Sequence, residues 1–176
     1  MVANAPKSST FTGFTLVELL VVMVLISILA LVGIPTFQGT QRKARDGKRK
    51  ADLVQVAKTI EMYANDMGRY PCATNPGGVD AGIMTDCVNA AYTWGKEFKH
   101  GLTVYMQKLP TDPLVPRQRY YYEPVDTDDV VGKGFRLWAY LEYADDADIV
   151  TNPNPAVINC LVGPCNYVVK SPNLIQ

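Results

Sequence analysis

A continuous apolar run near the amino terminus constrains this chain more than any other feature. Residues 14–37 read FTLVELLVVMVLISILALVGIPTF, and Glu18 is the one charged residue among these twenty-four. A helix of about 20 apolar residues spans the hydrocarbon core of a bilayer, so the run predicts a membrane helix. A secretory signal peptide would end in a small-residue cleavage site of the A-x-A kind, and none closes this run. We therefore expect the segment to stay attached to the mature protein.

Glu18 is out of place in such a run, because a carboxylate at the centre of a membrane helix costs roughly 2.5–3.5 kcal/mol. Gly13 stands directly before Phe14, and cleavage after Gly13 would create a positively charged α-amino group four residues ahead of Glu18. That amine, on the same or a neighbouring chain, would pair with the carboxylate. The plain alternative is that Glu18 lies at the level of the lipid headgroups.

Residues 13–35, GFTLVELLVVMVLISILALVGIP, closely resemble the amino-terminal signal of type IV pilins and pseudopilins, whose four elements are present here as Gly13, Phe14, Glu18 and Pro35. The resemblance implies that a prepilin peptidase cuts after Gly13 and methylates the new amine of Phe14. It also implies that Glu18 pairs with the Phe14 amine of an adjacent subunit while a homopolymeric filament assembles. The subunit would cross the cytoplasmic membrane once before assembly and lie in a cell-surface filament afterwards.

A second helical pattern follows the apolar run. Its apolar positions are Leu53, Val56, Ile60, Tyr63 and Met67, widened by Ala57 and Ala64. Spacings of three and four predict an amphipathic helix, which Gly68 and Pro71 should end. Pro35 should kink or open the helix near Gly33. A helix from 14 to about 67 would be about 80 Å long, and its first half has nothing in the same chain to pack against.

The start of this second pattern is strongly basic. Its cations are Arg42, Lys43, Arg45, Lys48, Arg49 and Lys50. Three interpretations compete: a solvated helix face, pairing with acidic heads of other subunits, and nucleic-acid contact, which is the weakest because no reading motif accompanies the run. Residues 38–70 carry eight bases and four acids, a balance of +4, whereas 71–176 carry eight bases and twelve acids, a balance of −4. A basic stalk and an acidic head can dock in a helical array by a contact that does not close.

The basic run also bears on membrane topology. The positive-inside rule favours a cytoplasmic location for 42–50, because the leader offers only Lys7 and the amino terminus. An even number of cysteines outside the apolar run favours an oxidising, exported location for the rest of the chain. The family resemblance agrees with the cysteines, so we expect the part after the helix to be exported.

Beyond residue 68 the helical period gives way to turn residues and short elements. Phe98, Leu102, Tyr105, Met106 and Leu109 predict a short helix. Strands are expected at 119–125, at 134–142, where apolar and polar residues alternate, and at 166–170. The stretch 126–134 reads as a hairpin loop. A small antiparallel sheet laid against a long helix predicts an α+β fold.

The order of GRYP at 68–71, a tryptophan, LPTDP at 109–113 and tyrosines before a strand resembles the major pseudopilins of type II secretion. The resemblance covers roughly 68–125 and is looser than the amino-terminal one. Four cysteines and a longer carboxy-terminal tail depart from that pattern, and they leave the choice between pilin and pseudopilin open.

The chain therefore divides into four expected segments. They are a cleaved leader at 1–13, a membrane and polymerisation helix at 14–37, an amphipathic stalk helix at 38–67 and an exported globular head at 68–176.

The four cysteines, Cys72, Cys87, Cys160 and Cys165, allow three disulfide connectivities. The local pairs 72–87 and 160–165 are favoured because each brackets a loop that contains glycine or proline. A loop of about 15 residues gains roughly 3 kcal/mol from such a bridge. A zinc site and free thiols are the alternatives, although Cys72 and Cys87 are too far apart in sequence for a zinc knuckle.

The densest set of oxygen ligands is Asp145, Asp146 and Asp148, with Asn152 and Asn154 nearby. Calcium prefers six to eight such oxygens on flexible loops, and major pseudopilins carry a calcium site in a comparable late loop. A structural calcium ion is therefore one hypothesis, and a solvated acidic loop is the other. If calcium binds, it should raise the melting temperature where magnesium does not.

An enzyme is not expected. His100 is the one histidine, in a lysine-rich stretch, and the sequence has no nucleophile elbow, phosphate loop, H-E-x-x-H or dinucleotide motif. Zero net charge excludes a globally basic nucleic-acid binder. The sequence indicates a structural filament subunit, whose work would be adhesion, motility, DNA uptake or secretion, driven by separate assembly machinery. The alternatives are a membrane-anchored binding protein that never polymerises and a minor pilin at a filament tip.

Overall fold

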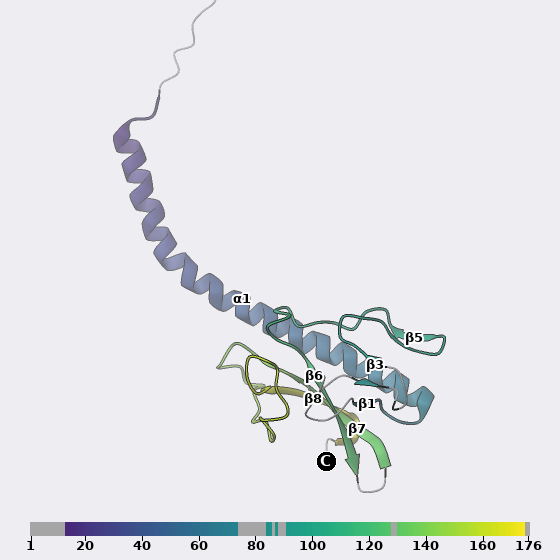
Figure 1. The fold of residues 1–176 in the computed structure, drawn as a ribbon. Coiled ribbons are helices and arrows are strands. Elements are labelled where there is room, and N and C mark those ends of the chain that lie inside the picture. Colours follow the sequence, from purple (N-terminus) through teal and green to yellow (C-terminus); the bar gives the residue numbers. More distant parts are fainter. Residues whose placement is uncertain (1–12, 74–83, 86, 88–90, 128–129, 175–176) are drawn as a thin grey trace, which may run out of the picture. The chain divides into compact units, whose positions relative to one another are not determined.

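The computed structural model describes residues 13–73, 84–85, 87, 91–127 and 130–174, and for 32–36, 126–127 and 130–132 it describes the backbone alone. The chain forms two compact units, the first up to Thr40 and the second from Gln41 to Gln176. One helix, α1 (Leu16–Met67), contributes to both units (Figure 1). The leader prediction for 1–13 lies almost wholly outside the described residues.

The strands within the described residues form three antiparallel sheets, which confirms the α+β class. The first contains β1 (Cys72–Ala73), β2 (Met84–Thr85) and β3 (Ala91–Tyr92). The second is the hairpin of β4 (Phe98–His100) and β5 (Thr103–Met106). The third contains β6 (Tyr121–Thr127), β7 (Val130–Ala139) and β8 (Tyr167–Lys170), followed by the 3₁₀ turn η1 (Pro172–Leu174).

The end of α1 agrees with the sequence. Gly68 follows the last helical residue with φ +73°, and its amide donates to the carbonyl of Ala64 over 2.8 Å. Only glycine adopts this left-handed conformation readily, so it stops the helix there. At the position of the predicted kink, α1 continues through residue 35 as one helix. The predicted kink at Pro35 falls where side chains are not described.

The apolar stripe of α1 packs on the inner face of the third sheet. Leu53, Val56, Ile60 and Tyr63 are buried, while Met67 is exposed and outside the core. From β7, Phe135, Leu137 and Ala139 join this core, as the predicted alternation requires.

The outer face of the same sheet is also covered. Trp138 packs there with Tyr121, Ile158 and the Cys160–Cys165 bridge. The segment after β7 therefore supplies a second, smaller core. The alternation in the sequence had predicted that only one face of this strand would be buried.

Two predictions for the head are wrong in detail. The short helix expected from Phe98 to Leu109 is the β4–β5 hairpin, in which His100 pairs with Thr103. Gly101 has φ +58° and makes the two-residue turn that a helix would not contain. The loop expected at 126–134 is mostly strand, because Thr127 of β6 already pairs with Val130 of β7.

Candidate assembly site

The helix α1 begins with a reciprocal pair of side chains. The amide and the hydroxyl of Thr15 both donate to Glu18 Oε2 over 2.8 Å, and the amide of Glu18 donates to Thr15 Oγ1 over 3.3 Å. This capping box satisfies amides that have no partner inside a helix. Its sequence signal is T-x-x-E at 15–18. From the sequence alone, Glu18 was interpreted only as one element of a processing motif.

Gly13 and Phe14 precede this cap outside the helix, and Phe14 is 87% exposed. Among the described residues, Glu18 Oε1 has no hydrogen-bond partner. The cap thus fixes the carboxylate at the first turn of the helix while one of its oxygens stays open to a further donor. The structure places Gly13, Phe14 and Glu18 together, whereas the side chain of Pro35 is not described.

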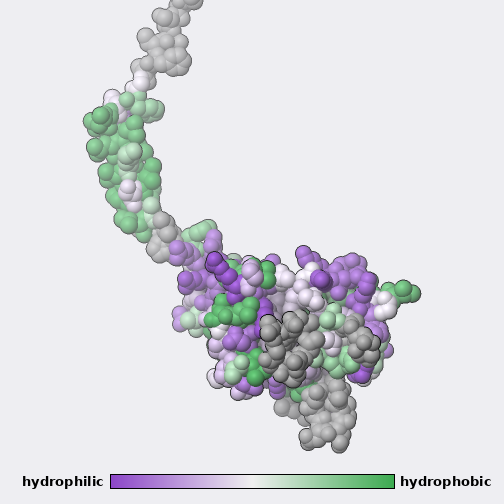
Figure 2. Space-filling view, in the orientation of Figure 1, coloured by the Kyte–Doolittle hydropathy of each residue, from purple (hydrophilic) through white to green (hydrophobic). Residues whose placement is uncertain are grey.

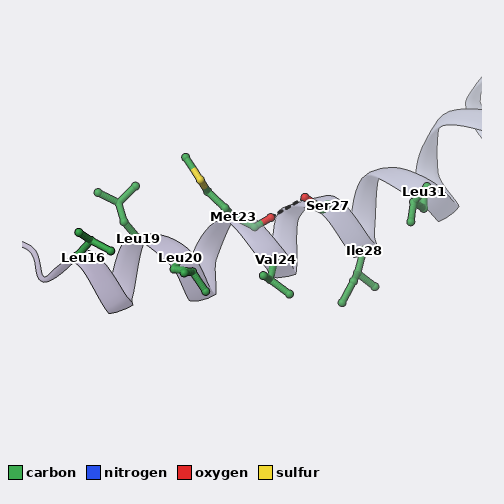
Figure 3. Close-up of a pocket in the computed structure, with 8 residues that line it drawn as sticks. All are labelled: Leu16, Leu19, Leu20, Met23, Val24, Ser27, Ile28 and Leu31. Atoms are coloured by element: carbon green, nitrogen blue, oxygen red, sulfur yellow. Dashed lines mark hydrogen bonds between the residues drawn. The ribbon is translucent and has the colours of Figure 1, made fainter.

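The apolar side chains that follow are exposed. Figure 3 shows Leu19 and Met23 projecting from one side of the helix and Leu20, Val24 and Ile28 from the other. Figure 2 shows the same stretch as a nearly continuous hydrophobic surface. Across the described part of the chain, no helix meets both the length and the apolar character that crossing a membrane requires, so the predicted span is not confirmed.

The basic run lies in the second unit, and part of it is buried against the rest of the same chain. Arg49 is fully buried, and its guanidinium donates to Asp112 over 2.7 Å, to Asp46 over 2.6 Å and to Glu142 over 2.7 Å. Burial disfavours the charged guanidinium, but these bonds outweigh it and raise the pKa of Arg49. One side chain of α1 is therefore bonded to the LPTDP turn and to the segment after β7.

Arg45 extends this ion cluster. Its Nε and Nη2 bind the two oxygens of Glu142 over 2.7 and 2.6 Å, a bidentate pair. The bond to Arg45, opposed by burial and helped by Arg49, lowers the pKa of Glu142 to about 2. Asp46 in turn accepts from the backbone amides of Glu142 and Tyr143. The helix is thus bonded to both the side chain and the backbone of this segment.

None of the three interpretations of the basic run anticipated this arrangement. Arg45, Arg49 and Lys50 bind carboxylates of their own chain, and the Lys43 ammonium lies 4.3 Å from the centre of the Tyr143 ring. The spacing of charges within the run gave no sign of this. The one available signal was the opposite charge balance of stalk and head, which was assigned to contacts between subunits.

Lys50 also bears on the calcium hypothesis. Its ammonium binds Asp146 and Asp148 over 2.6 Å each, and the Asp148 amide donates to Asp146 over 3.0 Å. The Asn152 side chain instead donates to the carbonyl of Ile158 and accepts from the amide of Asn154. Asp145 is exposed. In the described ranges no group of three or more His, Cys, Asp or Glu side chains is placed to hold a metal ion.

The other residues singled out in the sequence are the four cysteines and His100. The cysteines form the bridges 72–87 and 160–165, the two local pairs that the loops favoured. His100 is partly buried; its Nδ1 lies 3.2 Å from the Tyr92 hydroxyl, and its ring meets that of Tyr63 edge to face.

Comparison with known proteins places these features in a class. The prokaryotic N-terminal methylation motif matches residues 9–34, the stretch that contains the cap and the beginning of the exposed apolar helix. The chain therefore carries an amino-terminal motif of the prepilin type.

Relatives narrow the class further. The type II secretion system core protein G of Dickeya chrysanthemi is 33% identical over 135 residues, which cover 68% of this chain and 84% of that protein. The proteins of the same name from Aeromonas hydrophila and Escherichia coli K12 are 34% identical over 102 and 101 residues, 58% and 57% of this chain. The chain spans just under two thirds of those two relatives, 66% and 65% of their length. No solved structure matches.

This chain belongs to the type II secretion system core protein G family, a pilin-like family of structural pseudopilins. The choice between pilin and pseudopilin, which the sequence patterns left open, is thereby made in favour of pseudopilin.

Proposed function

We propose that this chain is the structural subunit of a type II secretion pseudopilus. The observation that carries the proposal is the apolar stretch 16–31, which lies within the matched prepilin motif and whose large side chains are exposed. Apolar surface of this extent is covered in a working protein, either by lipid or by other copies of the same helix. A subunit that passes from the first environment to the second uses the same side chains in both.

In this proposal the segments predicted from the sequence have successive roles. Prepilin peptidase removes 1–13 and methylates the amine of Phe14. The stretch 14–37 first anchors the subunit in the cytoplasmic membrane and then becomes filament core. The stalk 38–67 joins the head 68–176, which is exported and holds its two disulfides in an oxidising compartment.

Glu18 has two tasks in the same proposal. Its Oε2 caps α1 through Thr15, and its second oxygen accepts the Phe14 amine of a neighbouring subunit. Support comes from the geometry, since the cap holds the carboxylate within one turn of Phe14. An ion pair in an apolar filament core is strong, because little water competes for either charge.

Processing is tested by the amino-terminal sequence and intact mass of the protein from its native envelope. A start at Phe14 with one additional methyl group is expected. An intact Met1 would contradict processing and would favour a plain anchored protein.

Assembly is tested with a pair of substitutions at one position. Glu18→Gln keeps a capping side chain, because glutamine also serves in a capping box, but it removes the charge. We expect Glu18→Gln and Glu18→Ala to be inserted in the membrane at normal levels and to lose filaments by electron microscopy. Thr15→Ala removes the cap and keeps the charge, and it should assemble better than either. Filaments from Glu18→Gln as abundant as wild type would contradict the ion pair.

A further inference from the structure

The β4–β5 hairpin ends in a fully exposed leucine. Gly101 and Leu102 form its two-residue turn, and the Leu102 side chain is 103% exposed, the highest value among the large apolar residues that the structure describes. Burying a leucine of this kind stabilises a contact, because its apolar surface leaves water. A single exposed leucine is common on proteins, so its surroundings decide whether it marks a contact.

The base of the hairpin is rigid. Phe98 and Tyr105 pack their rings against Tyr63 of α1 at centroid distances of 5.5 and 5.4 Å, and the Tyr105 hydroxyl donates to Asp66 over 2.9 Å. A tip that is already ordered loses little conformational entropy when it binds. Leu102 is thus presented in one position rather than on a loose loop.

The flanks of the tip are basic. Lys96, Lys99 and Lys108 are exposed along the hairpin and its base, and Glu97 pairs with Lys99 over 2.9 Å. The stretch 96–108, the basic hairpin, carries three lysines against one glutamate, a balance of +2. Its partner should offer an apolar side chain beside carboxylates.

A complementary surface exists on the same chain. In the stretch 145–150, the acidic segment, Asp145 and Asp148 are exposed beside Val150, which is 38% exposed. The three aspartates of this segment and the bound Lys50 give a balance of −2, equal and opposite to that of the basic hairpin. Both surfaces combine exposed charge with exposed aliphatic side chains, which are Leu102 and Val104 on the basic hairpin and Val150 on the acidic segment.

The two surfaces lie at opposite ends of the second unit. The basic hairpin packs on Tyr63, whereas the acidic segment binds Lys50, thirteen residues earlier on α1. At 1.5 Å per residue these anchors are about 20 Å apart along the helix. Figure 1 shows β5 at one end of this unit and the yellow-green segment that follows β7 at the other. Complementary surfaces at opposite ends make a head-to-tail contact, which generates an open chain of subunits rather than a closed dimer.

We propose that the basic hairpin of one copy docks on the acidic segment of the next copy along the filament. Leu102 packs against Val150, and the lysines face Asp145 and Asp148. The contact rests on the proposed function, because it operates between subunits that their amino-terminal helices have already brought into a filament. It adds a second, head-level contact whose partner is this chain itself.

A cysteine pair tests the contact in the full-length protein. Leu102→Cys combined with Val150→Cys places one thiol on each surface, and both positions are exposed, so folding should be unaffected. Mild oxidation of assembled filaments should then give a ladder of covalent oligomers. Co-assembled single variants should give mixed dimers and no ladder. The control pair is Leu102→Cys with Val54→Cys, an exposed valine on α1, which should give no ladder.

The outcomes separate this contact from the proposed function. Wild-type filaments with no ladder from the 102/150 pair, or with an equal ladder from the 102/54 pair, overturn the contact and leave the filament intact. Crosslinking of residue 102 to a different envelope protein would assign the tip to that protein and would also overturn it. Absence of wild-type filaments refutes the proposed function and the contact with it.

Charge exchange gives an independent readout. Lys108→Glu and Asp145→Lys should each lower the yield of the 102/150 ladder several-fold, and the two substitutions combined should restore it. The single variants should keep the membrane insertion and processing of wild type. A combined variant no better than either single one contradicts the proposed pairing.

Discussion

The two parts of α1 reverse the usual rule for helices. In the first compact unit the helix is apolar and its side chains are exposed, as at Leu29 with 72% of its surface accessible. In the second unit the helix carries a basic run, yet Arg49 there is 0% exposed. Burial along this helix therefore follows the location of the partners rather than the polarity of the residues.

The difference lies in whether the chain supplies its own partner. Asp46, Asp112 and Glu142 surround Arg49, so its charge leaves water without being left unpaired. No comparable surface within the described part of the first unit covers the apolar side chains. The second part of α1 has its partners within the same chain, whereas the apolar side chains described for the first part are exposed.

The largest effect is expected from breaking the buried cluster. Arg49→Met should lower the free energy of unfolding by about 3–5 kcal/mol, because three carboxylates lose their shared partner. Lys48→Met removes the same charge one position earlier, at an exposed side chain, and should cost less than about 0.5 kcal/mol. Denaturant titration of the full-length chain in detergent, followed by the fluorescence of Trp94 and Trp138, measures both. Equal costs for the two variants would contradict the role given to the cluster.

A matched leucine pair contrasts the two parts of α1 directly. Leu53→Ala should cost about 2–5 kcal/mol in the same titration, because Leu53 is fully buried in the core. Leu29→Ala should change the unfolding free energy of the head by less than about 0.5 kcal/mol. The order should reverse for filament yield among folded subunits, where Leu29→Ala is the more harmful. A stability loss from Leu29→Ala as large as that from Leu53→Ala would show that the first unit is covered within its own chain.

Much of the fold was predictable because its signals are local. The stripe from Leu53 to Tyr63, the stop at Gly68 and the alternation at Phe135, Leu137 and Ala139 each follow from periodicity or from one backbone preference. The amino-terminal motif was readable for the same reason, since its residues are consecutive. The capping box of Thr15 and Glu18 was equally readable but was overlooked.

The failures concern partners that are distant in sequence. Nothing near Arg49 indicates that Asp112 and Glu142, 63 and 93 residues away, will surround it. In the stretch 98–109 the apolar residues are spaced as in a helix, but Gly101 adopts a positive φ and forms the turn of a hairpin. The cover of the outer sheet face by Ile158 and the Cys160–Cys165 bridge likewise depends on chain topology rather than on a local pattern.

Acid should weaken the ion cluster around Arg49 and Glu142. The pKa of Glu142 falls from 4.5 to about 2 in the folded protein, chiefly through its bond to Arg45. A lowered pKa stabilises the fold above pH 4.5, and that stabilisation is lost as the pH falls towards 2. Glu142→Gln should therefore be less stable than wild type by on the order of 3 kcal/mol at pH 7. The two proteins should converge in stability near pH 2.

Glu97→Gln is the matched control, because Glu97 pairs with the exposed Lys99 and lies outside the cluster. It should cost less than about 1 kcal/mol at pH 7, the usual value of a surface pair. Unfolding free energies from pH 7 to pH 2 measure both variants. A constant gap between wild type and Glu142→Gln across this range would contradict the assigned electrostatic role.

The smallest expected effect lies at the border between the two parts of α1. The Lys43 ammonium stands 4.3 Å from the Tyr143 ring centre, and it is the first cation of the basic run with a contact in the described head. Lys43→Gln should lower the unfolding free energy by about 0.5–1 kcal/mol, the usual size of an exposed cation–π contact. Arg42→Gln, which removes the neighbouring exposed cation, should have no measurable effect on head stability. Equal costs for the two substitutions would show that the head also contacts residue 42, and the part of α1 that has partners within its own chain would then begin at residue 42 or earlier.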